Sequence, residues 1–300
     1  MFFTDKGRCY WLKVFEIPEA SRQARGKSIA NLVEKQQDEN IAAFVPVQEF
    51  DENHYVAMVT ENGLIKKTAL SEYSNVRRTG ITAITLQKGD TVNDVKLTDG
   101  TQDIVIGTHN GMAIRFHEKE ARPMGRTAAG VRAINLNKGD KVVGAVSIKR
   151  RTTSILVVAE HGYGKRSELD EYRVSHRSGK GVFTVRVTDK TGQMVAIKEV
   201  LDNDDVVVVT TQGVVIRQPA KEIRLAGRNT QGVRLIRLES GDQVSAVAAV
   251  PSEEDDMAAK AEEAAKKQDE EQALLFEPEE KKETKAKGKT ATKPSKKKKK

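Results

Sequence analysis

The sequence predicts an all-β fold, a propeller-like array of antiparallel four-stranded blades over residues 1–250. Two observations lead to this prediction. A turn glycine recurs at intervals of 48 to 56 residues, which is the spacing of blade-type repeats. Short runs of β-branched residues flank these glycines, as expected for strands joined by hairpins. The five turn glycines are Gly7, Gly63, Gly111, Gly162 and Gly213.

Each repeat opens with an apolar run that predicts a first strand. These runs are Tyr55–Val59, Asp103–Ile106, Ser154–Val158 and Val206–Val209. A Thr-x-x-Gly turn follows in four copies, with Ala159–Gly162 as the variant, and a second short strand comes next. A polar, basic loop then leads to a second glycine, which is Gly26, Gly80, Gly130, Gly181 or Gly232.

The second half of each repeat predicts two more strands. An alternating stretch such as Val131–Ile134 follows the second glycine, and a Gly-Asp turn leads into a closing strand such as Gln243–Val250. With about four strands, each repeat is expected to form one blade. One blade cannot bury both of its faces, so we expect neighbouring blades to stack radially.

Other fold classes fit the pattern less well. A β-sandwich needs no fixed self-similarity at this period, and an α/β fold needs helices between its strands. The first 250 residues contain no long stretch with a period of 3.6 residues. Only Ala69–Tyr73 is compatible with a single helical turn.

The composition changes abruptly near Pro251. Residues 251–280 hold 12 acidic and 3 basic residues (net −9), and residues 281–300 hold 11 lysines and one glutamate (net +10). The two blocks sum to +1, which leaves +7 of the overall +8 on residues 1–250. A long charged segment with almost no aromatic residues cannot offset its ordering entropy. We therefore expect residues 251–300 to form a disordered tail, acidic and then lysine-rich.

Composition also predicts the compartment. Cys9 is the only cysteine, so no intrachain disulfide forms and a reducing environment is the default. Apolar runs such as Ile155–Ala159 are too short to span a membrane, and the N-terminus lacks the features of a secretory signal. These features predict a cytoplasmic, nucleoid-associated protein. Because Met1 lies only six residues before Gly7, we also expect that a preceding segment is missing.

Basic residues recur in register within the repeats. An arginine stands 15 residues after every turn glycine (position +15), and a basic residue stands at position +4 in four copies. Arginine pairs bidentately with phosphate oxygens, and duplex DNA carries one charge per about 1.7 Å. A small glycine after each arginine would let the backbone approach a phosphate closely. The predicted DNA-binding residues are Arg22, Arg25, Lys27, Lys67, Arg77, Arg78, Arg115, Arg122, Arg126, Arg166, Arg173, Arg177, Lys180, Arg217, Arg224 and Arg228.

The alternative interpretation is that these cations are solvated or paired with nearby acids. The candidate acids are Glu72, Glu118, Glu120, Asp170 and Glu222. A random surface charge has no reason to keep register, which favours a polyanion partner at the outer edge of the blades. The sequence offers no recognition helix, so we expect contacts to the DNA backbone that tolerate any base sequence.

No catalytic or metal-binding pattern is apparent. The five histidines are scattered, and there is no Cys/His cluster with metal-ligand spacing. Gly162–Lys165 is similar to the end of a phosphate loop, but Ala159 and Arg166 occupy positions that need Gly and Ser or Thr. We expect no catalytic residue, no metal and no cofactor in this chain.

The loops and turns together resemble the C-terminal domain of the DNA gyrase A subunit, part of a bacterial type IIA topoisomerase. The resemblance covers essentially residues 1–250 and is carried by Gly7–Val14, Ile17–Ala20, Thr79–Ile84, Met124–Gly125, Gly162–Arg166 and Gly227–Val233. It implies a six-bladed β-pinwheel that wraps double-stranded DNA around a basic rim. It further implies partnership with the rest of gyrase A and with gyrase B in ATP-dependent negative supercoiling.

The sequence departs from that family in two ways. The family's Gln-Arg-Arg-Gly-Gly-Lys-Gly box is only partly present, at Ser175–Gly181 and at Ala20–Gly26, and five repeats are visible rather than six. The breakage-reunion domain that bears the family's tyrosine is absent. The alternatives that stay open are the C-terminal domain of a topoisomerase IV A subunit and a protein-binding propeller scaffold. For the tail, either competition with DNA for the rim or a solubilising role is expected.

Overall fold

The computed structural model describes residues 1–21, 28–149 and 153–251, and Met1–Pro251 form one compact unit. This unit is built from short strands joined by turns, which confirms the predicted all-β class. The helical turn predicted near Ala69–Tyr73 is a 3-10 turn, η3. The one-turn helices are η1 (Val14–Glu16), η2 (Ile29–Asn31), η3 (Leu70–Tyr73), η4 (Glu118–Glu120), η5 (Leu169–Glu171) and η6 (Ala220–Glu222). The predicted tail lies outside the described residues from position 252 onward.

The strands form five antiparallel sheets, which we call blades 1 to 5 and list in spatial order. Blade 1 contains β3 (Ile41–Phe44), β1 (Phe2–Thr4), β2 (Arg8–Tyr10) and β6 (Ile81–Thr82). Blade 2 contains β10 (Val131–Arg132), β5 (Leu64–Ala69), β4 (Tyr55–Thr60) and β7 (Val92–Thr98). Blade 3 contains β11 (Val142–Ile148), β8 (Asp103–Thr108), β9 (Met112–His117) and β14 (Val182–Phe183). Blade 4 contains β15 (Met194–Val200), β12 (Ser154–Ala159), β13 (Tyr163–Glu168) and β18 (Val233–Arg234). Blade 5 contains β17 (Val215–Pro219), β16 (Asp205–Thr210) and β19 (Val244–Val250).

The outermost strand of blades 1 to 4 belongs to the following repeat. The strand β10, for example, follows Gly130 of the third repeat but pairs with β5 of blade 2. The expectation that one repeat equals one blade is therefore wrong in this detail: a repeat gives three strands to its own blade and a short fourth strand to the blade before. Among the described residues, no such strand pairs with β17 of blade 5.

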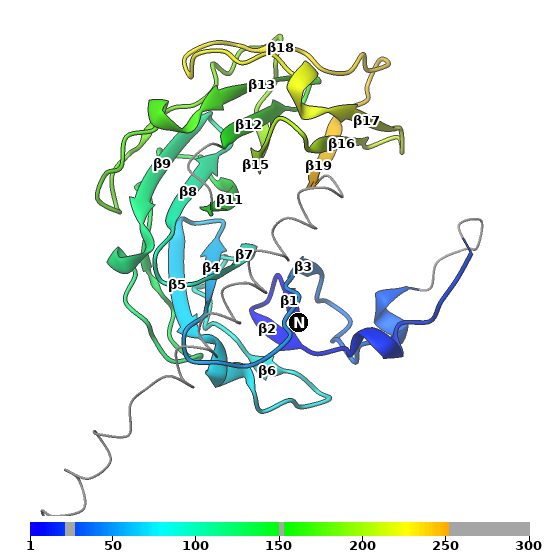
Figure 1. The fold of residues 1–300 in the computed structure, drawn as a ribbon, viewed down its shortest axis with the longest axis vertical. Helices are drawn as coiled ribbons and strands as arrows, with labels where there is room; N and C mark the ends of the chain where they lie inside the picture. Colours follow the sequence, from blue (N-terminus) through cyan, green and yellow to red (C-terminus); the bar gives the residue numbers. More distant parts are fainter. Residues whose placement is uncertain (22–27, 150–152, 252–300) are drawn as a thin grey trace, which may run out of the picture. The chain divides into compact units, whose positions relative to one another are not determined.

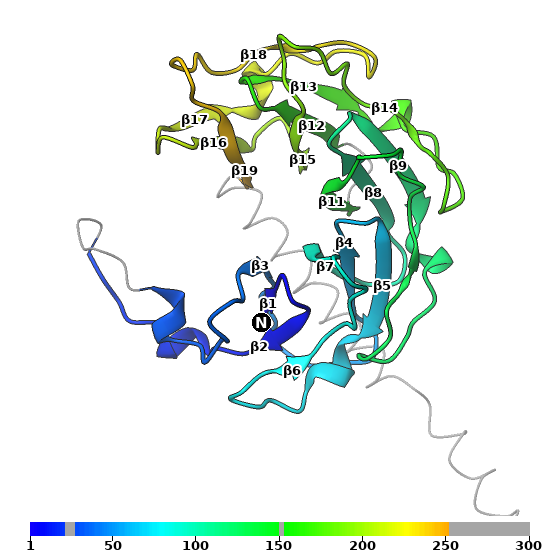
Figure 2. The same ribbon diagram turned by 180° about the vertical axis from the view of Figure 1, so that it is seen from behind.

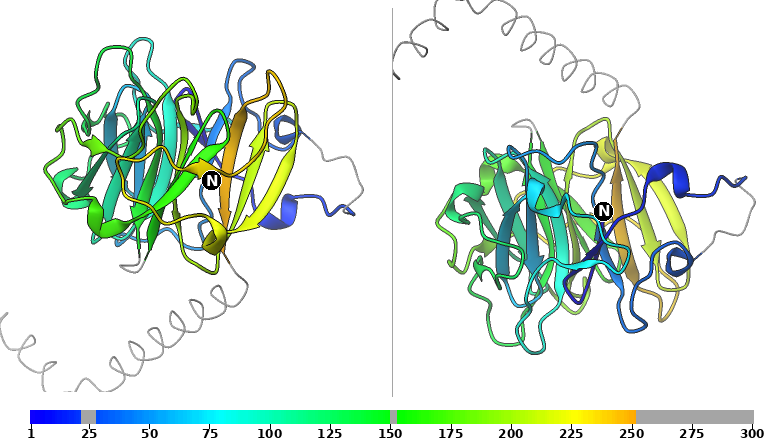
Figure 3. Two further views of the ribbon diagram at one scale, coloured as in Figure 1. Left: turned by 90° about the horizontal axis from the view of Figure 1, so that it is seen from above. Right: turned by 90° about the horizontal axis from the view of Figure 1, so that it is seen from below.

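The blades follow one another around a common centre in the order of the sequence (Figures 1 and 2). Their innermost strands are β3, β7, β11, β15 and β19, and each contacts the next in this order. Views from above and below show the strands of the blades running along the short dimension of this unit (Figure 3).

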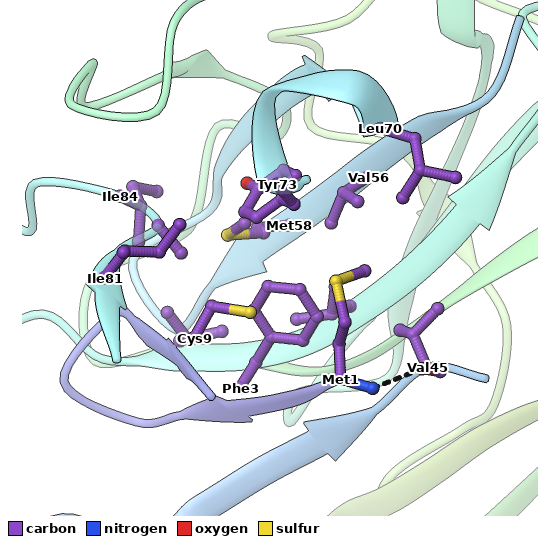
Figure 4. Packing of buried hydrophobic residues seen from close by; sticks show 13 residues of the cluster. Met1, Phe3, Cys9, Val45, Val56, Met58, Leu70, Tyr73, Ile81 and Ile84 are labelled. Atoms are coloured by element: carbon purple, nitrogen blue, oxygen red, sulfur yellow. Dashed lines mark hydrogen bonds between the residues drawn. The ribbon is translucent and has the colours of Figure 1, made fainter. Parts of the chain in front are cut away.

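The hydrophobic core is divided into four clusters, each lying between two consecutive blades. In the first cluster, Phe3 of blade 1 packs against Met58 and Tyr73 of the second repeat (Figure 4). The rings of Phe3 and Tyr73 meet edge to face, with centroids 5.9 Å apart. Consecutive blades thus cover each other's facing surfaces, as the stacking argument predicts.

The second glycine has a structural role in the repeats where it is described. Gly181 has φ = 78°, and a Cβ atom there would lie 2.3 Å from the carbonyl oxygen of Ala113 in blade 3. A Cβ on Gly232 would lie 2.4 Å from the carbonyl oxygen of Gly164 in blade 4. Only glycine combines this backbone conformation with so close an approach. The glycine therefore lets the outermost strand begin directly against the preceding blade, a reason for its recurrence that needs no phosphate.

Candidate nucleic-acid interface

The basic loops of repeats 3, 4 and 5 run along the outside of the preceding blade. The backbone of each loop pairs with the second strand of that blade, as the hydrogen bonds from Met124 N to Lys67 O, Ser175 N to Arg115 O and Ala226 N to Arg166 O show (each 2.8 Å). Three parallel bridges lie at the same positions. This geometry places the loops at the outer edge of the blades, where the sequence predicts them.

The arginines at position +15 are partly engaged with acids. Arg78 Nε lies 2.7 Å from Glu34 Oε1 on the surface, and Arg126 Nε lies 3.9 Å from Glu72 Oε2. Arg228 Nε lies 3.9 Å from Glu171 Oε2. The alternative interpretation, that nearby acids pair with these arginines, is therefore correct in part.

Two of these arginines also donate hydrogen bonds to backbone carbonyl groups of the preceding repeat. Arg177 donates to the carbonyl oxygen of Arg132 at 2.9 Å, and Arg228 donates to that of Phe183 at 2.8 Å. Both carbonyls belong to outermost strands formed by the preceding repeat. Glu120 and Glu171 accept the backbone N–H groups of the same two arginines at 2.8 Å. The arginine and the acid at position +9 thus hold successive loops together.

The cations at position +4 lie mainly between blades. Lys67 is buried and lies 3.3 Å from the carboxylate of Glu118, while Arg115 pairs with Asp103 at 2.8 Å. Arg115 and Arg166 also donate to backbone carbonyls of the following repeat. These three side chains point inward to the blade interface, so we do not place them among the DNA contacts that we predicted. Arg217 of blade 5 pairs with Asp205 and is two-thirds exposed.

Two fully buried lysines, which the sequence analysis did not single out, lie beneath the loops. Lys66 donates to the carbonyl oxygens of Ala83 and Arg126, and Lys165 donates to those of Gly227 and Arg228. Burial, reinforced by Arg126, lowers the pKa of Lys66 to about 7. Burial, reinforced by Arg228, lowers the pKa of Lys165 to about 8. Both lysines stand three residues after a turn glycine, and this shared position was the sequence signal that could have identified them.

Three of the predicted cations that remain free are at position +11. Arg122, Arg173 and Arg224 are exposed, and their side chains make no hydrogen bond or ion pair with the described residues. Arg77 and Lys180, elsewhere in the loops, are also exposed. Arg22, Arg25 and Lys27 lie outside the described residues.

Further exposed arginines were missed by the sequence analysis. They follow the second glycine of a repeat, on or just after the outermost strand, and are Arg132, Arg186, Arg234 and Arg237. The signal was the alternation in stretches such as Val131–Ile134, whose outward positions carry arginine.

Two further kinds of feature are absent from the described residues. They contain no group of three or more His, Cys, Asp or Glu side chains placed to hold a metal ion. No helix in the described part of the chain is long and apolar enough to cross a membrane.

Comparison with protein families identifies all five repeats. Residues 1–46, 54–99, 102–149, 153–200 and 204–251 match the family described as DNA gyrase C-terminal domain, beta-propeller. The DNA gyrase A subunit of Staphylococcus epidermidis is 44% identical over 255 residues, and that of Staphylococcus aureus is 43% identical over the same length. These alignments cover 84% of this chain but only 29% of each relative.

Solved structures show the same fold. A crystal structure of the C-terminal domain of DNA topoisomerase IV superposes with a TM-score of 0.78 at 31% identity, covering 88% of this chain and 83% of that chain. A structure of a DNA gyrase A C-terminal domain superposes with a TM-score of 0.74 at 21% identity, covering 83% of this chain and 81% of the other.

Proposed function

Because this chain belongs to the DNA gyrase C-terminal domain family of β-propellers, we propose that it binds duplex DNA along the outer edge of its blades. The observation that carries the proposal is the register of Arg122, Arg173 and Arg224. These arginines occupy the same position in repeats 3, 4 and 5, are exposed, and have no side-chain partner among the described residues. A row of unpaired guanidinium groups suits the regularly spaced phosphates of a duplex.

The proposed binding is tolerant of base sequence and bends the DNA. Phosphate contacts fix position without reading bases, and loops arranged around a common centre offer a curved path. Smooth bending is resisted below a persistence length of about 150 bp, so contacts on several blades must compensate for its cost. Binding should therefore strengthen with duplex length until all the loops are engaged.

In the whole protein, we propose that this chain serves gyrase A as the part that wraps DNA. The chemistry of ATP-dependent negative supercoiling would then be supplied by the rest of gyrase A and by gyrase B. The second candidate is the corresponding domain of topoisomerase IV, favoured by the superposition at 31% identity. Gyrase is preferred because the gyrase A relatives reach 44% identity over 84% of the chain.

A topology assay tests this function. Nicked plasmid is ligated with increasing amounts of the full chain, the protein is removed, and the linking-number distribution is measured. A shift toward positive linking number supports wrapping in the sense that gyrase requires. Binding without a shift refutes wrapping by this chain and leaves a DNA-binding edge. Absence of both refutes the proposal and favours a protein-binding scaffold.

A matched pair of triple variants tests which cations act. The change R122Q/R173Q/R224Q should reduce the slope of log K against log salt by about 3, since each lost phosphate contact contributes about 0.9. The control K6Q/K88Q/K138Q removes the same charge from exposed turns and should change this slope little. Equal effects of the two variants would refute the assignment of the edge.

A further inference from the structure

One end of blade 4 departs from the repeat pattern. The residue after the turn glycine is Arg8, Leu64, Met112 or Val214 in the other repeats but Tyr163 in the fourth. Tyr163 pairs in register with Arg234 of β18, just as Leu64 pairs with Arg132 of β10. Blade 4 therefore has an aromatic side chain where blade 2 has an aliphatic one, and each lies opposite an arginine at the equivalent position of its outermost strand.

Tyr163 is held between two cations. Arg234 donates to its hydroxyl oxygen at 3.0 Å, and the guanidinium carbon lies 5.6 Å from the ring centroid. The ammonium nitrogen of Lys190 lies 5.3 Å from the same centroid. The hydrogen bond from Arg234 is the main reason why the pKa of Tyr163 is lowered. Two positive charges thus converge on one phenol.

The turn that carries Lys190 also differs from its counterparts. In repeats 2, 3 and 5, the closing turn supplies a carboxylate that accepts a backbone N–H of the Thr-x-x-Gly turn, and these residues are Asp90, Asp140 and Asp242. In repeat 4, His161 N donates instead to the carbonyl oxygen of Thr191 at 3.0 Å. Thr191 therefore takes the place of the aspartate that binds the turn in the other repeats, and the acid of this turn, Asp189, stands two residues earlier.

The replacement turn is well ordered by its own hydrogen bonds. Thr191 is fully buried, its N–H donates to Thr188 O at 3.1 Å, and its hydroxyl oxygen accepts from Thr188 N at 3.0 Å. The N–H of Gly192 donates to Thr188 O at 2.9 Å. Lys190 is therefore presented from a fixed turn, which reduces the entropy lost when its ammonium group binds an anion.

These groups border a pocket of about 550 Å³. The cations that line it are Lys190, Arg234 and Arg237, with His161 beside them, and the carboxylates are Glu239 and Asp242. Asp242 is occupied, because one of its oxygens accepts from Thr211, Gln212 and Gln243. The pocket thus offers two guanidinium groups, an ammonium group and a phenol hydroxyl, which are donors suited to phosphate oxygens.

We propose that this pocket binds a phosphate group, supplied either by a free oligophosphate or by the backbone of a nucleic acid. Arg234 and Lys190 neutralise the anion, and the hydroxyl of Tyr163, oriented by Arg234, donates to a phosphate oxygen. Blade 2 has Arg132 at the position of Arg234 and Lys88 in the turn that corresponds to that of Lys190. It has Leu64 in place of the tyrosine and the carboxylate of Asp90 in that turn, so it lacks the site. The inference does not depend on the proposed function.

Calorimetric titration of the full chain with inorganic pyrophosphate tests the site. R234Q and K190Q should each weaken binding about tenfold, since each removes a charge-assisted contact. The matched variants R132Q and K88Q should leave it unchanged. Y163F keeps the ring in place, removes only the hydroxyl, and should weaken binding as well. No binding to the unaltered chain, or equal losses in the matched variants, would overturn the proposal.

Short duplex DNA identifies the source of the phosphate. If R234Q and K190Q weaken binding of a 12-bp duplex more than R132Q and K88Q do, the ligand is the nucleic-acid backbone. If duplex binding is equal in all four variants while pyrophosphate binding is lost only in the first two, the ligand is a free oligophosphate. Because the pyrophosphate titration contains no DNA, its result stands whether or not the outer edge binds DNA.

Discussion

At the scale of single residues, cations that recur at fixed positions in the repeats lie in two different environments, one between blades and one on the surface. Arg115, at position +4, extends from a strand toward the next blade and is enclosed by Asp103 and by the carbonyls of Leu169 and Tyr172. Arg122, seven residues later, stands on the loop and is exposed. Recurrence of charge in the sequence therefore marks both the contacts between blades and the surface, and only the neighbouring blade distinguishes the two.

A pair of substitutions within one repeat should separate these roles. R115Q leaves Asp103 without its partner, so the free energy of unfolding should fall by about 2 kcal/mol, with the salt dependence of DNA binding unchanged. R122Q should change stability by less than about 0.5 kcal/mol but reduce the salt slope by about 0.9. Urea denaturation and fluorescence anisotropy with labelled duplex measure the two quantities. The reverse pattern would show that the assignment is wrong.

The buried lysines predict how stability depends on pH. The pKa of Lys66 is about 7 in the folded chain, against an ordinary value of 10.5. Between these values the unfolded chain binds more protons than the folded one, so the free energy of unfolding should rise with pH. The expected slope is about 1.4 kcal/mol per pH unit for each neutral lysine. K66M should make the free energy of unfolding depend less on pH above pH 7, and K165M should do so above pH 8.

Urea denaturation at a series of pH values checks this prediction. The slope with pH is the relevant quantity, because either substitution also removes hydrogen bonds to two carbonyls and lowers stability at every pH. K88M, at an exposed turn, is the control and should leave the slope unchanged. A curve for K66M that parallels that of the unaltered chain would show that Lys66 keeps its ordinary pKa.

At the scale of elements, the sequence predicts strands and turns well but not their partners. The apolar runs and turn glycines place the long strands of blades 2 to 5, because period and turn chemistry are local properties. A two-residue strand such as β10 pairs with the blade formed by the preceding repeat. No feature of the sequence Val131–Arg132 indicates that partner. The candidate site followed the same rule: the loops were placed at the edge, but the burial of Lys67 was not foreseen.

The exchanged strand depends on its glycine. G181A should destabilise the chain by about 3 kcal/mol, because alanine at φ = 78° is strained and its Cβ would meet the carbonyl of Ala113. G89A is the matched control, since Gly89 has φ = 80° but open space around the Cβ position. Its cost should be only about 1 kcal/mol, that of the backbone conformation. Equal losses by urea denaturation would show that the close approach is unimportant.

At the scale of the whole described unit, the two terminal blades each present a face that is covered elsewhere. Positions +7 and +10 are buried in the second and fourth repeats, where Leu70, Tyr73, Leu169 and Tyr172 are at most 3% exposed. Their counterparts in the first repeat, Val14 and Ile17, are 83% and 46% exposed. At the other end, β17 has no outer partner strand among the described residues, and Val215 is 61% exposed.

Those two faces predict self-association of the isolated chain. An unpaired strand edge beside exposed apolar side chains is a template for pairing with another molecule, and the first blade presents the surface that a preceding blade covers in other repeats. Sedimentation velocity should therefore show a weight-average sedimentation coefficient that rises with concentration.

V215K, which places a charge on the open edge, should suppress this rise, whereas S240K, with the same added charge on an exposed turn, should not. A chain that stays monomeric, or an equal effect of both variants, would show that the open edge is inert. If V215K also leaves the linking-number shift unchanged, a single molecule wraps the DNA, and self-association is not required for wrapping.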